Sequence, residues 1–387
     1  MIAPQHSVQP LPERRRRAGR PAVGVMCFHR AALTLASVCP GCITKPARWR
    51  KKHHVNSKRV SVPASAKTGR YAIVAAIGLA FLCRTATAEE GGSGHYLPGS
   101  MASFVDGVPL TETFIARLNL VYYQGSIGAE RPLPIGGRTA LGASASSWAY
   151  GLTLLCRPPL ELGERWSYAM SATIPALSMH VNADVATTLP GGVTGTVARA
   201  SNTNGLGDVV LMPLMLNYNV DPDFNVNFRV GTYAPTGNYK VGRLANTGKN
   251  FWTVEPVLGL MYFGQKNGIE GSVFTGFDFN TENTDTDYQS GRQVHVDGTL
   301  AQHVPRAGGL AGAGVSAYYY QQVSDDSGSG ATLGAFNGRT TGLGPALSYA
   351  RKVSGCDTIA ELKWLKEVET KNRLDGDIVW LKAVVKF

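Results

Sequence analysis

Two histidines in one strand-like segment have a spacing that could carry chemistry. His295 and His303 are eight residues apart, and Asp297 lies between them. Because side chains on a strand alternate between two faces, all three would share one face. Imidazole and carboxylate groups on one face could bind a metal ion or relay a proton. The plainer interpretation is the polar lining of a water-facing surface, so we predict no metal site and no cofactor.

Clustered side-chain oxygens between Asn280 and Tyr288 form a second candidate site. The run NTENTDTDY could hold calcium, but it lacks the spacing, the glycine and the terminal glutamate of an EF-hand loop. We therefore expect a solvated loop. The nucleophile motif GxSxG does not occur in the sequence, so no catalytic residue is predicted and a lipid hydrolase is a distant alternative.

The net charge of +11 is distributed unevenly along the chain. Of the 38 basic residues, 16 precede Glu89 together with one of the 27 acids, which leaves 22 bases and 26 acids in the remainder. A mildly acidic body with dispersed charges and no basic stripe argues against nucleic acid as a partner. Forty-five glycines and a charged fraction of 17% favour strands and turns over helices.

Residues 67–88 have the three parts of a secretory signal peptide. Lys67 and Arg70 form the basic part, the apolar run YAIVAAIGLAFLC follows, and the small residues Ala86-Thr87-Ala88 end it. We predict cleavage after Ala88. Residues 1–66 are rich in Arg, Lys, Ser and Pro without periodicity, so we interpret them as a disordered or spurious extension. No apolar run of about 18 residues follows the signal, which excludes a helical membrane protein.

The rest of the chain alternates between apolar and polar side chains. In residues 224–230, FNVNFRV, every second side chain is apolar, and this period of two indicates a sheet with one lipid-like and one water-like face. We predict an all-β, transmembrane, antiparallel up-and-down β-barrel of about 12 strands over residues 113–387, with 89–112 as an N-terminal periplasmic or lumenal segment. The predicted strands are 113–124, 141–155, 165–177, 206–219, 223–235, 251–263, 269–280, 292–304, 309–322, 341–353, 358–369 and 376–387.

The connections between these segments alternate in length, as short periplasmic turns and longer outer loops do in such barrels. The short ones are 220–223, 264–268, 305–308 and 354–357, and the long ones are 178–205, 236–250, 281–291 and 323–340. A soluble β-sandwich has no reason to sort its loops in this way. The connection 371–375 is short for its predicted outer position.

Aromatic residues and prolines mark special places in the predicted strands. The last strand, IVWLKAVVKF, ends at Phe387, and a terminal aromatic residue is typical of the signal that barrel-assembly machinery reads. Aromatic residues near strand ends would suit interfacial girdles; these are Tyr122, Trp166, Tyr262, Trp364 and Trp380. Three prolines inside strands, Pro213, Pro256 and Pro345, are each predicted to mark a bulge or a kink, and a kink at Pro256 could open the wall sideways to lipid.

Several motifs from about His95 onward resemble one family of outer-membrane proteins. The matching pieces are HYLPG at 95–99, GLGDVVLMPLML at 205–216, APTGNYKVGRLANTGKNFWTVEP at 234–256, FDFNTENTDTDYQSG at 277–291, YYYQQVSDDSG at 318–328 and GLGP at 342–345. They resemble the family named for the meta-pathway of phenol degradation, also called the SphA-like transporters. That family is named from genetic neighbourhood with aromatic degradation, and no shared catalytic residues are associated with it.

These observations together predict an outer-membrane channel or transporter for the passive uptake of small hydrophobic or aromatic compounds. Outer-membrane lipid and the barrel-assembly machinery are its other expected partners. The alternative is a non-conducting structural or lipid-binding outer-membrane protein. Strand parity predicts the lumen-lining residues of the substrate path: Arg117, Asn119, Asn225, Asn227, Arg229, Glu255, Glu270, Asp278 and His295.

Overall fold

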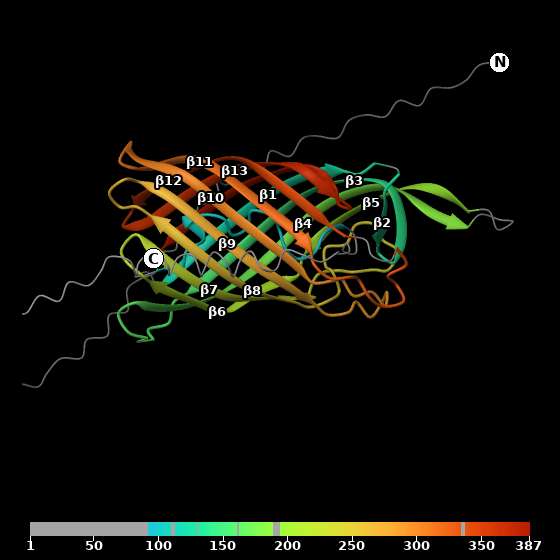
Figure 1. Cartoon of the computed structure of the whole chain (residues 1–387), viewed down its shortest axis with the longest axis horizontal. Coiled ribbons are helices and arrows are strands. Elements are labelled where there is room, and N and C mark those ends of the chain that lie inside the picture. Colours follow the sequence, from blue (N-terminus) through green and yellow to red (C-terminus); the bar gives the residue numbers. More distant parts are fainter. Residues whose placement is uncertain (1–91, 110–112, 129, 161, 189–193, 334–336) are drawn as a thin grey trace, which may run out of the picture. The chain divides into compact units, whose positions relative to one another are not determined.

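Twelve antiparallel strands of the described chain close into a barrel (Figure 1). The computed structural model describes residues 92–109, 113–128, 130–160, 162–188, 194–333 and 337–387. The predicted extension 1–66, the predicted signal peptide 67–88 and its cleavage site lie outside these residues. Among the described residues, no helix is long and apolar enough to cross a membrane.

Each barrel strand pairs with the next one along the chain, and the last pairs with the first. The barrel strands are β1 (Phe114–Ser126), β3 (Arg138–Cys156), β4 (Trp166–Thr188), β6 (Val209–Asn219), β7 (Phe224–Ala234), β8 (Thr253–Phe263), β9 (Ile269–Asn280), β10 (Gln293–Arg306), β11 (Gly309–Gln322), β12 (Arg339–Val353), β13 (Cys356–Lys371) and β14 (Asp375–Lys386). Pairing of β1 with β14, from Ile115 opposite Lys386 to Ser126 opposite Asp375, closes the ring. Closure leaves no unpaired strand edge in the wall. A β-sheet that spans a membrane needs this, because lipid offers no hydrogen-bond partner to its backbone. The predicted fold class and strand count are confirmed.

Two further strands extend the wall beyond the predicted segments. β2 (Pro132–Ile135) pairs with β3, and β5 (Thr194–Leu206) pairs with the second half of β4. The prediction that 178–205 is a loop is therefore wrong over most of its length. The alternation continues beyond 177 to Val185 with its two faces exchanged: apolar residues such as Met179 and Val181 lie inward, and polar residues such as His180 and Asn182 lie outward. This exchanged pattern was missed.

The strands turn an apolar face outward and a mixed face inward. Leu300 on β10 is 67% exposed, whereas its neighbour Thr299 is 6% exposed. Leu381 on β14 and the terminal Phe387 are exposed, whereas Trp380, next to Leu381, is buried. The assignment of Trp380 to an outer aromatic girdle is thus wrong, because it sits at an inward position of the strand.

The barrel has a turn end and a loop end. The connections 220–223, 264–268, 307–308 and 354–355 are short and lie at the turn end, where Phe387 N–H also bonds the carbonyl of Phe114. The loop end carries 127–137, 235–252, 281–292 and 323–338. As predicted, one loop-end connection, 372–374, is short.

The three strand prolines behave differently from one another. At Pro213 the register of β6 shifts against both β4 and β7, which confirms the predicted bulge. The register of β8 with β9 is the same on both sides of Pro256, and that of β12 with β13 is the same on both sides of Pro345. A bulge at these two prolines is therefore ruled out. Each proline lies where the ladder to the next strand is interrupted, so no hydrogen bond of that ladder needs the N–H that proline lacks.

Candidate functional site

Residues 92–109, here called the lumenal segment, contact inward-facing side chains of many barrel strands. Ser93 accepts a hydrogen bond from Lys249 near the loop end, and Phe104 packs against His303 toward the turn end. A short 3-10 turn in this segment is η2 (Phe104–Asp106). Because Met101 and Asp106 are 4% and 2% exposed, the segment is enclosed by the wall.

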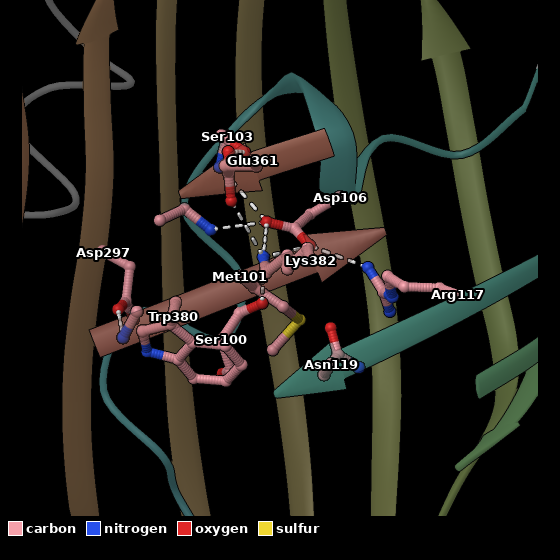
Figure 2. A network of polar contacts seen from close by, with 12 residues as sticks. Ser100, Met101, Ser103, Asp106, Arg117, Asn119, Asp297, Glu361, Trp380 and Lys382 are labelled. Carbon is pink, nitrogen blue, oxygen red and sulfur yellow. Dashed lines mark hydrogen bonds and ion pairs between the residues drawn. The ribbon is translucent and has the colours of Figure 1, made fainter. Parts of the chain in front are cut away.

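Asp106 is the principal ionic anchor of the lumenal segment (Figure 2). Both of its carboxylate oxygens lie 2.8 Å from Nζ of Lys382, and Oδ1 lies 2.7 Å from Nη1 of Arg117. Oδ2 also accepts the backbone N–H of Ala102 at 2.9 Å. One carboxylate therefore closes the local turn and neutralises two cations of the wall. Burial by itself would raise the pKa of Asp106, but Lys382, Arg117 and Lys363 hold that pKa well below its usual range.

A second set of bonds ties the same segment to β13 and β7. Ser103 donates to Glu361 (Figure 2). The other carboxylate oxygen of Glu361 lies 3.1 Å from Nζ of Lys363. Lys363 also donates to the carbonyl of Gly99 at 2.8 Å. Arg229 donates to the carbonyl of Asp106. Buried charges are tolerated only when they are paired in this way, so the wall and the segment depend on each other.

The other end of the segment rests on a histidine and an aspartate of β10. Tyr96 stacks on His295, with ring centroids 3.8 Å apart, and its hydroxyl donates to Asp297 at 2.9 Å. Asp297 also accepts the N–H of Gly99 at 2.7 Å. Nε2 of His295 lies 2.8 Å from Oε1 of Glu255. This part of the lumen is filled by the segment.

Glu255, Asp278 and His295 are close enough to share a cation. One ligand atom of each lies within 4.8 Å of the others, and all three are buried. Both ring nitrogens of His295 already lie against carboxylates, Nε2 against Glu255 and Nδ1 against Asp297. We therefore assign no metal to this cluster.

The second histidine of the sequence motif lies in a separate place. His303 pairs with Glu270 at 2.8 Å and contacts Phe263 and Phe104. Eight residues of strand separate it from His295 by about 26 Å, so the two rings share a face but no ligand.

The nine predicted lumen residues all lie at inward positions of their strands. Seven of them lie on β7 to β10 and line no part of the cavity described below; they are Asn225, Asn227, Arg229, Glu255, Glu270, Asp278 and His295. Arg117 and Asn119 on β1 line that cavity. As a path for solutes, the whole set stays a prediction.

A cavity of about 390 Å³ lies between residues 92–101 and the wall of β1, β3 and β4. Small side chains on β3 make room for it, because Ala145, Ser147, Ala149 and Gly151 occupy successive inward positions there. Apolar residues of β4 and β6 continue the lining, including Leu177 and Val210. This wall is not among the predicted lumen-lining residues. The signal that could have found it is the run ASASSWAYG, in which the inward side chains are all small and the outward ones become large.

An apolar cluster closes the cavity toward the loop end. Leu133 and Ile135 of β2 pack with Leu244 of the 235–252 loop and with Val181 of β4. Leu133, Ile135 and Leu244 also line the cavity. A solute entering from the loop end must therefore displace apolar side chains.

The opposite part of the cavity is polar. Oγ1 of Thr153 lies 2.7 Å from Oγ1 of Thr173, and Nδ2 of Asn119 approaches Thr153 at 3.5 Å. Among the described residues, Oδ1 of Asn119 and Nε of Arg117 have no hydrogen-bond partner. The cavity thus combines apolar walls with a few polar groups at one place, as binding sites for small molecules do.

These features define an outer-membrane type of β-barrel, partly filled by its own N-terminal segment and retaining an apolar cavity beside it. The family model for the MetA-pathway of phenol degradation matches residues 129–383. The chain belongs to this family, which confirms the resemblance seen in its motifs. Among curated proteins, none matches the chain.

Solved structures with a similar chain path are barrels as well. An outer membrane channel from Pseudomonas putida F1 has 15% sequence identity and a TM-score of 0.52, and the match covers 76% of this chain and 100% of that one. A Pseudomonas aeruginosa FadL homologue and the CymD monoaromatic hydrocarbon channel are each 10% identical, with TM-scores of 0.37 and 0.35. Their matches cover 79% and 72% of this chain and 99% and 89% of theirs. The first likeness supports the fold, and the other two are too remote to carry an argument.

Proposed function

We propose that the protein is an outer-membrane channel for the passive uptake of small hydrophobic or aromatic compounds. The observation that carries this proposal is the cavity of about 390 Å³ beside the lumenal segment, with its apolar walls. An apolar cavity of about 150 Å³ is already enough to bind benzene. A molecule with one aromatic ring therefore has room here.

The orientation follows from the two ends of the barrel. Short turns face the periplasm and long loops face the outside in barrels of this type. Solutes would enter past the apolar cluster of Leu133, Ile135 and Leu244, which suits apolar compounds better than sugars. The exposed outer side chains contact outer-membrane lipid, and β14 with Phe387 is the element that the barrel-assembly machinery would read.

A second candidate is a non-conducting structural or lipid-binding barrel. The lumenal segment favours it, because the segment reaches from Lys249 near the loop end to His303 toward the turn end and is held by buried ion pairs. If the segment never moves, the lumen conducts nothing and the cavity only stores a ligand.

Single-channel conductance and liposome swelling separate these two functions. The full-length protein is refolded into liposomes, and sugars and small phenolic compounds are compared as test solutes. We expect phenolics to pass faster than sugars of equal mass. A folded barrel that neither conducts nor swells liposomes would overturn the channel proposal and leave the structural role.

A further inference from the structure

We infer that His95 and Asp208 couple the entrance of the cavity to the lumenal segment, so that a loop covering the cavity opens when the top of that segment is released. This inference rests on the proposed function and concerns the control of its entrance. The loop consists of residues 237–248 between β7 and β8 and is here called the lid. His95 belongs to the lumenal segment, and Asp208 lies between β5 and β6.

The lid covers the cavity at the loop end of the barrel. Tyr239 and Leu244 of the lid line the cavity. Leu244 and Ala245 are buried in the apolar cluster that closes it. At the tip of the lid, the N–H of Gly242 donates to the carbonyl of Gly136, which follows β2, at 2.7 Å. The lid therefore crosses from β7 and β8 to the turn after β2, and a solute that enters from this end has to displace it.

Asp208 closes the neck of the lid with both of its carboxylate oxygens. Oδ1 accepts the N–H of Gly237 at 2.8 Å, and Oδ2 accepts the N–H of Lys249 at 2.7 Å. The two sides of the neck touch directly, since a Cβ placed on Gly237 would lie 2.6 Å from Cα of Gly248. One buried side chain thus holds the residues at both ends of the lid.

The same carboxylate holds the lumenal segment. Nε2 of His95 lies 2.9 Å from Oδ2 of Asp208, and Nδ1 lies 2.6 Å from Oγ1 of Thr253. Thr253 gives its only hydroxyl proton to Asn280 at 2.6 Å, so it accepts the bond from His95. A carboxylate only accepts, and both ring nitrogens of His95 are therefore donors. The contact with Asp208 is a charge-assisted hydrogen bond between an imidazolium and a carboxylate.

Aromatic side chains fix the ring of His95 in this position. Tyr233 of β7 stacks on it with ring centroids 4.9 Å apart, and Phe251 packs against it edge-on at 5.0 Å. The side chains of His95 and Asp208 are both buried. The charged contact is thus shielded from water on the side of the segment as well as on the side of the lid.

Burial of this contact couples the two moving parts. Release of the segment would leave Asp208 as a buried carboxylate without the imidazolium, which is strongly unfavourable. Water can hydrate that carboxylate only if the neck of the lid opens. Release of His95 and opening of the lid therefore favour each other, and the two residues act as a latch on the entrance.

The test measures how often the lid opens. Ala245 is fully buried, so a cysteine at this position reacts with a bulky water-soluble maleimide only when the lid opens. The parent chain is full-length Ala245→Cys with its native cysteines replaced by serine, and its labelling rate is measured in the outer membrane of intact cells. We expect His95→Phe, which keeps a ring but has no donor, to raise this rate about 10-fold, as loss of one hydrogen bond to a charged group does.

Further variants of the parent chain make the result specific. His95→Gln keeps a donor near the place of Nε2, so its rate should lie between those of the parent chain and His95→Phe. Asp208→Asn should also raise the rate, and adding His95→Phe to it should raise the rate no further, because both changes remove the same contact. His180→Phe makes the matched change at an exposed position of β4 and should label as slowly as the parent chain.

The outcomes separate the inference from the function on which it rests. An unchanged rate in His95→Phe, or a further increase of about 10-fold when His95→Phe is added to Asp208→Asn, overturns the coupling. Rapid labelling of the parent chain itself overturns the closed lid. Heat-dependent migration on gels shows that each variant is folded. None of these rates depends on transport, so the conductance experiment decides separately on the channel.

Discussion

Asp106 and Lys382 are 276 residues apart in the sequence, and their charged atoms lie 2.8 Å apart inside the barrel. The contact joins the lumenal segment to β14, the strand that closes the ring with β1. Both side chains are fully enclosed, with side-chain exposures of 0% and 1%. A pair of this kind is costly to break because either partner alone would be a buried, uncompensated charge.

Replacement of Asp106 by Asn should loosen the lumenal segment. The neutral amide would keep an acceptor for the backbone but leave Lys382 and Arg117 without their counter-charge. Loss of one partner of a buried pair costs about 3–5 kcal/mol, so we expect the Asp106→Asn variant to lose its heat-resistant gel form at a lower temperature. We also expect more frequent or larger openings in single-channel recordings than wild type shows.

A surface ion pair supplies the matched control for this variant. Lys352 and Asp357 lie 3.2 Å apart with side-chain exposures of 72% and 42%. Exposed pairs contribute about 0–1 kcal/mol, so Asp357→Asn should resemble wild type in both measurements. If Asp106→Asn also resembles wild type in both measurements, the lumenal segment is not held by the contact between Asp106 and Lys382.

Docking of the lumenal segment should be insensitive to mild acid. The pKa of Asp106 is lowered in the folded protein, since its neighbours Lys382 and Arg117 outweigh burial. A carboxyl group with a lowered pKa contributes stability above its unfolded pKa of about 4, and this contribution is lost only as the pH falls through the lower folded value. Protease resistance of the segment should therefore be constant from about pH 7 to pH 5.

Below about pH 4 the wild-type segment should become progressively easier to cleave. Asp106→Asn cannot titrate at this position, so its cleavage rate should be high already at neutral pH and should change less with acid. Loss of protection in wild type above about pH 5 would mean that another group controls docking.

The fold could be predicted from the sequence because a transmembrane barrel repeats one rule. Lipid outside and water inside impose alternation on every strand, and 224–230 shows that alternation without exception. The prediction was wrong where the rule weakens, as in the second half of β4. There the outward side chains become polar and the inward ones apolar, and β5 pairs with β4 beyond the predicted segment.

The site was harder to predict because it depends on contacts between distant parts of the chain. Parity placed Arg117 and Asn119 on the inward face, but it could not show that only these two of the nine predicted residues would border the cavity. That division is made by the lumenal segment, which covers the side of the barrel with Glu255 and His295. The 18 residues of 92–109 have no alternating pattern that would show which wall they cover.

Filling the cavity should reduce transport without unfolding the barrel. Gly151→Leu places a side chain in the space between β3 and the lumenal segment, where a Cβ has only ordinary contacts. We expect the uptake of small phenolics into liposomes or cells to fall by about 10-fold, because the leucine side chain would occupy the space that a solute needs. Ala360→Leu on β13 makes a similar change on the outward face and should leave uptake as it is. Equal uptake by all three proteins would show that solutes pass elsewhere.

The ladder on one side of β4 is interrupted at Pro175 beside the cavity, and solutes that leave toward lipid should pass there. The pairing of β4 with β6 ends at Thr173 and its pairing with β5 begins at Ala176, so Pro175 lies at the break. The N–H of Gly207 bonds the carbonyl of Pro175 at 2.9 Å, and Pro175 lines the cavity whereas Pro256 does not.

Replacement of Pro175 by Val restores an N–H with which the ladder can close. If solutes leave through this gap, Pro175→Val should slow the uptake of apolar compounds severalfold and leave sugars unaffected. Pro256→Val, in a wall without a register shift, should behave as wild type in the same assay. A loss of uptake in Pro256→Val alone would place the exit at β8 instead. No loss of uptake in either variant would mean that solutes leave through the turn end of the lumen.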